Sequence, residues 1–326
     1  MVHFFGIYIN DINNATTFFK FICYADDTTL TNNLIATKNL IGSDNIDALA
    51  GKINEEIKRV CDWLDVNKLS LNAGKTKFMI FRKKNKSLKE HEIPKLFVRN
   101  TPIVRETEFD FLGITISEDL TWQKHITKVS KKISKVNGVL TKLRYFLPRH
   151  TLKTIYNSLV LPHIQYGITL WGHDCKRIEL LQKQCIRKIC QVKKYKAHTD
   201  PLFKFTSLLK VSDIHKLFCL KIFFKFENKL LPQYLQTIFP RNSEFHRYET
   251  STANEFYVLT HNTTEIKNTI RYKIPSLIPS IPGEILAKIH THSIETFSKH
   301  VKKFLISNYN SKCPIGPPNC YVCKIK

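Results

Sequence analysis

The sequence lacks any uninterrupted run of about 18 apolar residues, which is the length that a bilayer-spanning helix requires. Its first residues, Met1 to Ile9, also lack a basic leader and a small-residue cleavage site, which together mark a secretion signal. These absences exclude membrane-spanning and secreted proteins. They predict an intracellular protein, cytoplasmic or nuclear, with no membrane partner.

Acidic residues are scarce, since 27 Asp and Glu face 51 Lys and Arg and leave a net charge of +24. The deficit is greatest between Thr121 and Leu230, where 23 basic residues face only 5 acidic ones. A set of solvated helix faces is the plain alternative, but it rarely requires such an imbalance. We therefore expect a polyanionic partner, and nucleic acid is the first candidate.

The nine cysteines show no regular disulfide spacing, because most stand singly inside apolar segments. There a free cysteine packs as a small hydrophobic residue, and a reducing compartment is expected. The exception is the C-terminal group Cys313, Cys320 and Cys323, in which the last two have a spacing found in zinc sites. Spacing does not fix a fourth ligand, although His292 or His300 would supply one. The alternative to a Zn²⁺ site is a tail with free thiols.

Short apolar runs and turn signals predict an α+β region in the first third of the chain. The expected strands are 18–23, 28–31, 75–81, 96–98 and 109–116, with an amphipathic helix over 52–64. Gly113 inside the last strand predicts a bend or a close approach by another backbone. The first predicted domain is therefore 1–117.

The rest of the chain is predicted to be mainly α-helical. The longest helix is expected over 123–147, where apolar residues recur at alternating intervals of three and four. Further helices are expected over 151–161, 176–192, 213–230 and 285–309, whereas Pro275, Pro279 and Pro282 predict a linker. These patterns divide this part into a basic helical domain, 118–232, and a C-terminal helical, Pro-containing domain with a cysteine-bearing tail, 233–326.

Two adjacent carboxylates, Asp26 and Asp27, follow Tyr24 and Ala25 between two stretches of strand-like composition. Because neighbouring strand residues point to opposite faces of a sheet, these carboxylates converge only at a tight turn. Two such groups repel each other, and a divalent cation such as Mg²⁺ relieves the repulsion. The alternative is an ordinary Asp-rich hairpin turn.

Five segments, taken together, resemble the second half of the palm of a reverse transcriptase. They are Tyr8-Ile9-Asn10-Asp11, Phe21-Ile22-Cys23-Tyr24-Ala25-Asp26-Asp27-Thr28, Trp63-Leu64 to Asn72, Lys75-Thr76-Lys77 and Phe111-Leu112-Gly113-Ile114. The resemblance is closest to RNA-directed DNA polymerases of non-long-terminal-repeat (non-LTR) retrotransposons, and the stretch from Trp122 to Trp171 is similar to their thumb side. The Tyr-Ala-Asp-Asp turn alone is only moderately specific, but five segments in this order are highly specific.

The resemblance implies two-metal phosphoryl transfer on an RNA template and a DNA primer. Asp26 and Asp27 would be the catalytic carboxylates that hold Mg²⁺. Tyr24 would lie beside the primer end, and Lys75 would approach the triphosphate. Phe111, Leu112 and Gly113 match the hairpin that grips the primer strand in this family. Five lysines of the long basic helix would follow the nucleic-acid backbone: Lys124, Lys128, Lys131, Lys132 and Lys135. Each role has a plain alternative. Tyr24 would be a buried strand residue, Lys75 a solvated turn residue and the segment 111–113 part of a core strand. The lysines of the long helix would form a solvated face.

The sequence departs from the family pattern ahead of Tyr8. The family has an earlier palm strand with a third carboxylate and a Pro-Gln-Gly segment, and no stretch of this sequence matches either one. We therefore expect a retrotransposon-derived fragment that has no polymerase activity alone. One alternative is a non-catalytic nucleic-acid-binding protein built on the palm and thumb remnant. Another is a basic helical interaction protein whose Tyr-Ala-Asp-Asp turn is accidental, which the ordered segments disfavour.

Overall fold

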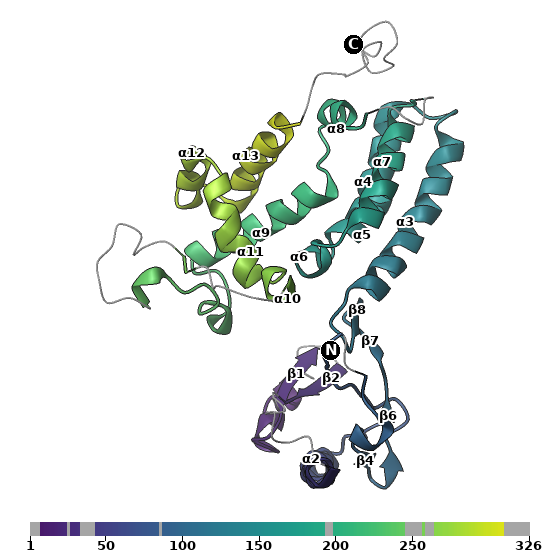
Figure 1. Cartoon of the computed structure of the whole chain (residues 1–326), viewed down its shortest axis with the longest axis vertical. Helices are drawn as coiled ribbons and strands as arrows, with labels where there is room; N and C mark the ends of the chain where they lie inside the picture. The colour runs from purple at the N-terminus through teal and green to yellow at the C-terminus, as the bar shows by residue number, and fades with distance from the viewer. Residues whose placement is uncertain are drawn as a thin grey trace, which may run out of the picture. The chain divides into compact units, whose positions relative to one another are not determined.

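The computed structural model describes residues 7–24, 27–32, 43–84, 87–192, 198–244, 256–257 and 264–309 (Figure 1). The chain forms two compact units, Met1–Thr121 and Trp122–Lys326. The first unit holds all of the described strands, and the second is helical. This mixed α and β composition with small hairpins agrees with the predicted class. The predicted boundaries at 117 and 232 stay predictions.

Within the described part of the first unit, the strands form four separate two-stranded pairs. The bounds are β1 Lys20–Tyr24, β2 Asp27–Thr31, β3 Lys77–Phe78, β4 Phe97–Val98, β5 Thr101–Pro102, β6 Val104–Arg105, β7 Glu108–Phe111 and β8 Ile114–Ser117. The pairs β1–β2, β4–β5 and β7–β8 are antiparallel, whereas β3–β6 is parallel. Two-stranded ribbons are marginally stable by themselves, so these pairs depend on packing against other elements.

The helix α2 (Ser43–Val66) supplies that packing for β4 and also contacts the short helix η2 (Glu90–Glu92), whereas the short helix η1 (Ile12–Asn14) contacts β1. Ile57 and Cys61 of α2 are buried together with Val98 of β4. The amide of Asn54 fixes this contact, since its Nδ2 donates to the Lys95 carbonyl at 3.0 Å and its Oδ1 accepts from the Phe97 N–H at 2.9 Å. The predicted helix over 52–64 is confirmed and is longer than expected.

The described elements of the second unit are all helices. The longer ones are α3 Gln123–Leu143, α4 Arg149–Leu159, α7 Lys176–Ile189, α9 Val211–Glu227 and α13 Ile294–Ser307. The shorter ones are α5 Leu161–Gln165, α6 Ile168–Trp171, α8 Asp200–Thr206, η3 Gln233–Leu235, η4 Asn242–Glu244, α10 Thr264–Lys267, α11 Ile270–Leu277, η5 Ile278–Ser280, α12 Gly283–Leu286 and η6 Ala287–Ile289. One hydrophobic core extends through the unit from Ile126 to Tyr309.

The apolar stripe of α3 packs against α7, as Figure 1 shows for the two neighbouring helices. Ile126, Val129, Ile133 and Leu140 are all buried on this stripe. The predicted spacing is thus confirmed, but the helix ends at Leu143 rather than at 147. The stripe is the face that α3 turns to its own unit, which agrees with a packed basic helix rather than a separate coiled coil.

One buried glutamine joins three parts of this core. The side chain of Gln182 is 1% exposed, and its Nε2 donates to the Tyr156 hydroxyl at 2.8 Å and to the Leu209 carbonyl at 2.9 Å. Its Oε1 accepts from the Val211 N–H at 3.0 Å. Because buried polar groups destabilise a fold unless they are paired, these bonds fix how α4, α7 and the start of α9 meet.

The linker predicted from three prolines is wrong. Pro275 lies inside α11 and is buried, and Pro279 lies in η5. The apolar residues between the prolines decide the outcome, since Ile274 and Ile281 are buried in the core of the second unit. Pro282 is the N-cap of α12, so the three prolines lie inside or at the start of short helices. The predicted helix over 285–309 is also divided, into α12, η6 and α13, and α8 was not predicted.

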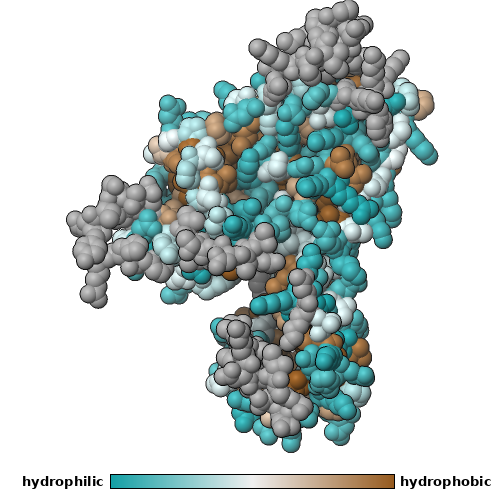
Figure 2. Space-filling model, in the orientation of Figure 1, coloured by the Kyte–Doolittle hydropathy of each residue, from teal (hydrophilic) through white to brown (hydrophobic). Residues whose placement is uncertain are grey.

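The surface of the second unit is mainly hydrophilic in the view of Figure 2, with a hydrophobic patch over α12 and α13. Six cysteines in the described ranges are free thiols, and all except Cys23 are buried, as expected for small hydrophobic residues. None of the helices that the structure describes has both the length and the apolar character needed to cross a membrane.

Candidate functional site

The hairpin β1–β2 flanks the adjacent Asp26 and Asp27 of the sequence, and Asp27 is the first residue of β2. Tyr24 of β1 pairs with Asp27 of β2, so that the sequence leaves only Ala25 and Asp26 to connect the strands. A two-residue connection is the commonest kind in antiparallel hairpins. The predicted tight turn is therefore confirmed by the register of its flanking strands. Asp26 itself lies outside the described residues.

Both described residues beside this turn face solvent. The Tyr24 side chain is 63% exposed, so it is not the buried strand tyrosine of the alternative interpretation. The Asp27 carboxylate is also exposed and has no hydrogen-bond or ion-pair partner among the residues that the structure describes. Its oxygens are therefore accessible to a ligand. At the other end of the hairpin, Asn32 Nδ2 donates to the Phe18 carbonyl at 2.7 Å and holds the strands together.

Lys75 lies in a turn that Asn72 organises. The Lys75 N–H donates to the Asn72 side-chain oxygen at 3.2 Å, and the Thr76 hydroxyl donates to the Asn72 carbonyl at 2.9 Å. The Lys75 side chain is exposed and has no ion-pair partner among the residues that the structure describes, whereas the nearby Lys77 forms an ion pair with Glu106. Of the two lysines, Lys75 is therefore the one whose ammonium group is available to an anion.

Phe111, Leu112 and Gly113 form the tip of a second hairpin, as the family resemblance implies, whereas the local pattern predicted one bent strand. Phe111 pairs with Ile114, and Leu112 and Gly113 connect β7 to β8 with φ angles of 48° and 80°. Positive φ at both central positions gives the twist that two-residue hairpins require. Glycine adopts this conformation freely, but leucine does so at a cost. The alternative of a core strand fails for Leu112, which is 36% exposed.

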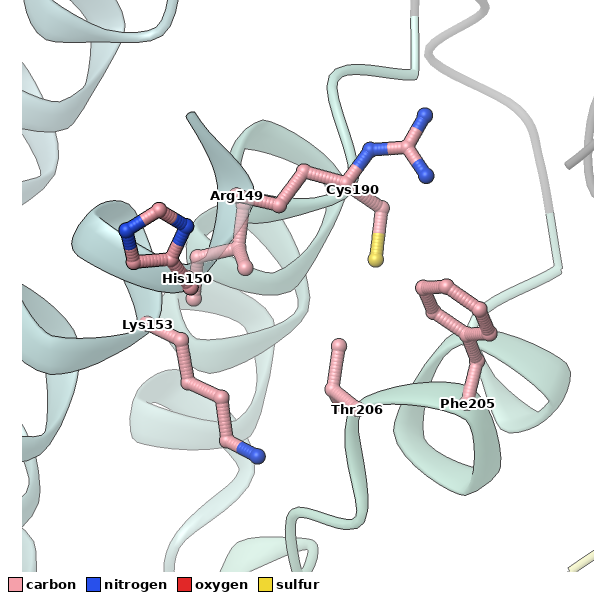
Figure 3. A pocket seen from close by; sticks show the side chains of 7 residues that line it. Arg149, His150, Lys153, Cys190, Phe205 and Thr206 are labelled. Atoms are coloured by element: carbon pink, nitrogen blue, oxygen red, sulfur yellow. The ribbon is translucent and has the colours of Figure 1, made fainter. Parts of the chain in front are cut away.

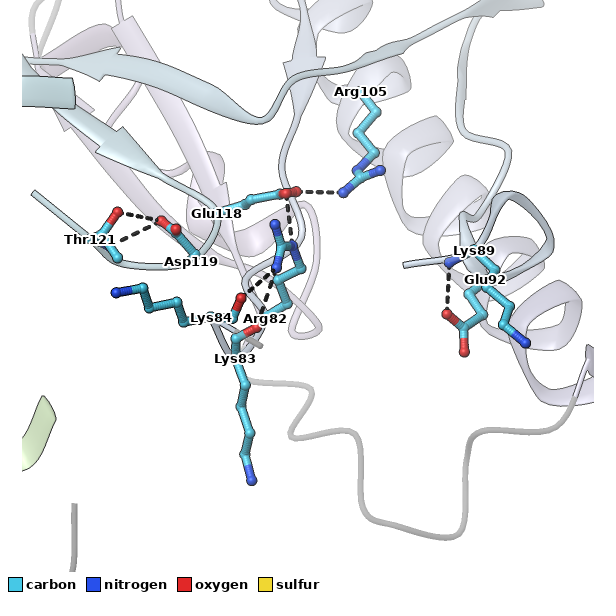
Figure 4. Close-up of polar contacts among 9 residues, drawn as sticks. All are labelled: Arg82, Lys83, Lys84, Lys89, Glu92, Arg105, Glu118, Asp119 and Thr121. Carbon is cyan, nitrogen blue, oxygen red and sulfur yellow. Dashed lines mark hydrogen bonds and ion pairs between the residues drawn. The ribbon is translucent and has the colours of Figure 1, made fainter. Parts of the chain in front are cut away.

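A buried carboxylate holds the base of this second hairpin (Figure 4). Glu118 follows β8, and its side chain is only 9% exposed. It accepts a hydrogen bond from Arg82 Nε at 2.7 Å and forms an ion pair with Arg105 of β6. The Arg82 N–H also donates to the Glu118 carbonyl at 2.8 Å. Sequence reasoning missed this cluster, although an acidic residue after a strand in so basic a chain was the available signal.

Two further segments singled out in the sequence meet in the first unit. The Tyr8 hydroxyl donates to the carbonyl of Asn67, which follows α2. The Asn67 side chain in turn donates to the Trp63 carbonyl at 2.9 Å. The tips of the two hairpins and the Lys75 turn, by contrast, belong to three different local structures.

The lysines predicted to contact the nucleic-acid backbone lie on α3, away from its buried stripe. Lys124, Lys131, Lys132 and Lys135 are exposed, and Lys128 is half-buried. The charge of Lys132 also reaches His163 of α5. Burial and this nearby charge hold the pKa of His163 below its usual value. The solvent side of α3 is therefore a row of cations.

The predicted zinc ligands Cys313, Cys320 and Cys323 lie outside the described residues. The two histidines predicted as alternative fourth zinc ligands, His292 and His300, lie close together, with ring centroids 5.8 Å apart. His292 contacts the Thr291 hydroxyl at 2.7 Å, and His300 contacts the Thr296 carbonyl at 2.8 Å. No group of three or more metal-ligating side chains occurs within the ranges that the structure describes.

No protein-family model matches the chain, and no solved structure matches it. Several curated proteins do match. A probable RNA-directed DNA polymerase from the transposon X-element of Drosophila melanogaster is 26% identical over 148 residues, which are 43% of this chain and 16% of that protein. The RNA-directed DNA polymerase from the mobile element jockey of the same species is 25% identical over 179 residues, 51% of this chain and 17% of that protein.

A third relative is a putative 115 kDa protein of a type-1 retrotransposable element of Drosophila melanogaster, which is 30% identical over 112 residues. That match covers 33% of this chain and 10% of the relative. The chain thus spans only a small part of the length of each curated relative that it matches. By these matches and by the ordered segments around the two hairpins, the chain is a relative of the RNA-directed DNA polymerases of non-LTR retrotransposons.

Proposed function

We propose that this chain carries part of the palm and the thumb side of an RNA-directed DNA polymerase. The parent activity would be RNA-directed DNA synthesis by two-metal phosphoryl transfer. The observation that carries the proposal is the hairpin β1–β2, in which Tyr24 pairs with Asp27 and the sequence places Asp26 directly before Asp27. The similarity to curated RNA-directed DNA polymerases supports it.

The donor chemistry of the turn fits Mg²⁺, because carboxylate oxygens are its preferred ligands and the Asp27 carboxylate is exposed without a described partner. Asp26 and Asp27 would hold the ion. When bound, Mg²⁺ supplies the positive charge that stabilises developing negative charge on the reacting oxygens. Tyr24 would lie beside the primer end, Lys75 would approach the triphosphate, and the tip at Leu112 and Gly113 would support the primer strand.

The cationic face of α3 would bind the nucleic-acid backbone. Lys131, Lys132 and Lys135 are exposed, and the opposite stripe of the helix is fixed in the core. Phosphate contacts of this kind give affinity and position without reading sequence. This face also supports the second candidate function, a nucleic-acid-binding protein without catalysis.

We further propose that the 326 residues alone bind a primer–template duplex without extending it. Two-metal chemistry in this family uses a third carboxylate, and no stretch of this sequence matches the palm strand that carries it. The proposal concerns this polypeptide whatever else accompanies it in a longer protein.

Binding and extension are measured on the same duplex. In the triple variant Lys131→Ala, Lys132→Ala and Lys135→Ala, the slope of log K against log salt concentration should fall by about 2.7, because each phosphate contact contributes about 0.9. A charge-matched control is Lys58→Ala, Lys225→Ala and Lys267→Ala, which removes three lysines from other surfaces. An equal effect of both triple variants would contradict a role for α3.

Primer extension with Mg²⁺ separates the two candidate functions. We expect no nucleotide incorporation by the chain and unchanged duplex binding by Asp26→Ala with Asp27→Ala. Extension by the unmodified chain that disappears in Asp26→Ala would overturn the proposed inactivity and would support catalysis by this polypeptide. Loss of duplex binding in the Asp variants would instead show that the turn has a structural role.

A further inference from the structure

Two aromatic side chains stand exposed in the connection between α3 and α4. Tyr145 is 72% exposed and Phe146 is 83% exposed. The guanidinium of Arg144 lies 4.8 Å from the centroid of the Tyr145 ring, so a cation accompanies the aromatic pair. Neither ring contributes to the core, and their exposure therefore has no explanation in the packing of this unit.

The backbone that presents these rings is fixed. The side chain of Gln191, just beyond α7, donates to the carbonyls of Arg144 at 3.3 Å and Leu147 at 3.1 Å. The Phe146 N–H donates to the Leu143 carbonyl at 3.0 Å. Because the connection is already ordered, a ligand that stacks on the rings does not have to order it.

A small basic pocket begins directly after this connection (Figure 3). It has a volume of about 130 Å³ and is lined by residues of three helices and their ends: Arg149, His150 and Lys153, then Ile189 and Cys190, then Phe205 and Thr206. In Figure 3 the Arg149 and Lys153 side chains extend on either side of Cys190 and Thr206. Phe205 at the edge is a further aromatic ring and is 53% exposed.

The charge of this pocket is not compensated by the protein. No carboxylate lines it, and no ion pair to Arg149 or Lys153 occurs among the residues that the structure describes. Burial raises the pKa of Cys190 to about 12, so its thiol carries no negative charge near pH 7. Burial and the Lys153 charge also lower the pKa of Lys302 on α13, which places a further cation nearby. Gathered cations repel one another, and an anion relieves the repulsion.

Arg149 and His150 also begin α4, whose unpaired N–H groups carry partial positive charge. The pocket is large enough for a phosphate group but too small for a whole nucleotide. A base attached to a bound phosphate would have to lie outside, where Tyr145, Phe146 and Phe205 are exposed. Aromatic rings stack on unpaired bases, and the stacked bases of a duplex do not offer such faces.

We propose that this end of the second unit, formed by Tyr145, Phe146, Arg149, Lys153 and Phe205, binds single-stranded nucleic acid. The backbone phosphate enters the pocket between Arg149 and Lys153, and bases stack on the exposed rings. The site is distinct from the duplex-binding face proposed for α3. It requires neither metal nor polymerase activity, so its test is independent of catalysis.

The test measures binding of the full chain to a fluorescent oligothymidine of about 15 nucleotides by anisotropy, at several salt concentrations, on the scale of single-strand site sizes. In Arg149→Ala with Lys153→Ala, the salt slope should fall by about 0.7, since the variant loses the contact with the one phosphate in the pocket and each single-strand phosphate contact contributes about 0.7. Affinity at 0.1 M salt should fall on the order of tenfold. The control Lys225→Ala with Lys267→Ala removes the same charge from α9 and α10.

Removing an aromatic ring should change the affinity but not the salt dependence of binding. Phe146→Ala should weaken binding roughly fivefold or more and leave the salt slope unchanged, because stacking involves no counterion release. Tyr234→Ala is the matched control, since Tyr234 is 75% exposed on η3. Both Phe146 and Tyr234 are solvent-facing, so these variants should fold, which circular dichroism checks.

Four outcomes would overturn the proposal. The first is unchanged oligothymidine binding in the Arg149 and Lys153 double variant. The second is an equal loss of oligothymidine binding in the variants and their controls. The third is an equal loss of duplex and single-strand binding in Phe146→Ala, which would remove the preference for unpaired bases. A Phe146 variant that alters only self-association would identify the rings as a protein contact and also overturn it.

Discussion

The two units of this chain bury their apolar residues to very different extents. Every described hydrophobic residue with no measurable exposure lies in the second unit, including Ile133, Tyr156, Trp171 and Phe297. In the first unit the tightest core cluster consists of Ile57, Cys61 and Val98. Its strands leave large side chains exposed, among them Ile22 and Val104. A helical scaffold with a closed core thus accompanies a set of hairpins with little core of its own.

The difference indicates where stability and where ligand contact reside. The second unit gains stability from hydrophobic burial, which scales with the apolar area removed from water. The first unit relies more on paired strands and on ion pairs such as those of Glu118. The proposed metal and primer contacts lie in this less buried unit. We therefore expect the first unit to unfold locally at a lower free energy than the second.

The largest expected effect comes from the core of the second unit. Trp171 is fully buried, and its Nε1 donates to the Tyr166 carbonyl at 3.0 Å. Trp171→Ala should lower the free energy of unfolding of this unit by about 3–5 kcal/mol, because it removes a large side chain and leaves a cavity. Hydrogen exchange read by mass spectrometry, peptide by peptide, measures the loss in each unit.

The matched control is Trp63→Ala, since Trp63 is only half-buried at the end of α2. We expect a smaller loss of amide protection that stays within residues 1–121. If Trp171→Ala lowered protection equally in both units, the units would unfold as one cooperative structure and the comparison would fail.

Acid should act next most strongly, again on the second unit. Burial, with the neighbouring charges of Lys273 and His173, lowers the pKa of His215 from 6.5 to about 4. Between these values the unfolded chain takes up a proton that the folded chain refuses, so stability falls as pH decreases from 6.5 toward 4. At about 1.4 kcal/mol per pKa unit the loss is on the order of 3 kcal/mol.

Urea unfolding followed between pH 7 and pH 4 measures this effect. His215→Gln should flatten the pH dependence, whereas the exposed His150→Gln should leave it unchanged. An unaltered pH dependence in His215→Gln would assign the acid sensitivity to other groups, of which the partly buried His173 is the first to test.

The smallest of the three effects should appear in the first unit. Glu118→Gln keeps the shape of the side chain but removes the charge that pairs with Arg82 and Arg105. We expect a loss of about 1–2 kcal/mol, because these groups are largely but not fully buried. Exchange at the amides of β7 and β8 reports it.

Asp65→Asn is the control, since the Asp65 and Arg99 side chains are 55% and 45% exposed and such pairs contribute about 0–1 kcal/mol. A Glu118→Gln effect no larger than that of the control would mean that the second hairpin does not depend on its buried carboxylate.

Local pattern predicted the elements whose signal lies within a few residues. The spacing of Ile126, Val129 and Ile133 gave α3, and the composition around Asp27 gave the first hairpin. Pattern failed where distant contacts decide. The prolines near Ile274 and Ile281 suggested a linker, but burial of these isoleucines in the core organises short helices instead. Gly113 is a different case, because the local pattern suggested a bend, whereas the family resemblance implied the hairpin that the pairing of Phe111 with Ile114 makes.

The residues of the candidate site also fall into those that local sequence predicted and those that only folding brings together. The sequence predicted the residues of the Tyr24 and Asp27 turn, since they are adjacent in the chain. It did not predict the Glu118 cluster, because Arg82 and Arg105 approach it only after folding. The pocket beside Arg149 was missed for the same reason, since its other walls come from Cys190 and Phe205. Spacing cannot reveal groups that tertiary packing alone brings together.

Tyr309 has a consequence for the order in which the second unit assembles. Its hydroxyl donates to Asp213 at 2.7 Å and accepts from the Lys210 N–H at 3.0 Å, across nearly a hundred residues of chain. Contacts between α3 and α7 close loops of about half that length, as from Asn137 to Gln184. Doubling a loop adds only about 0.6 kcal/mol of closure entropy, yet longer-range contacts form more slowly. We expect α3 and α7 to pair early and α13 to dock last, so that a nascent chain would hold its basic helix in place before Tyr309 leaves the ribosome.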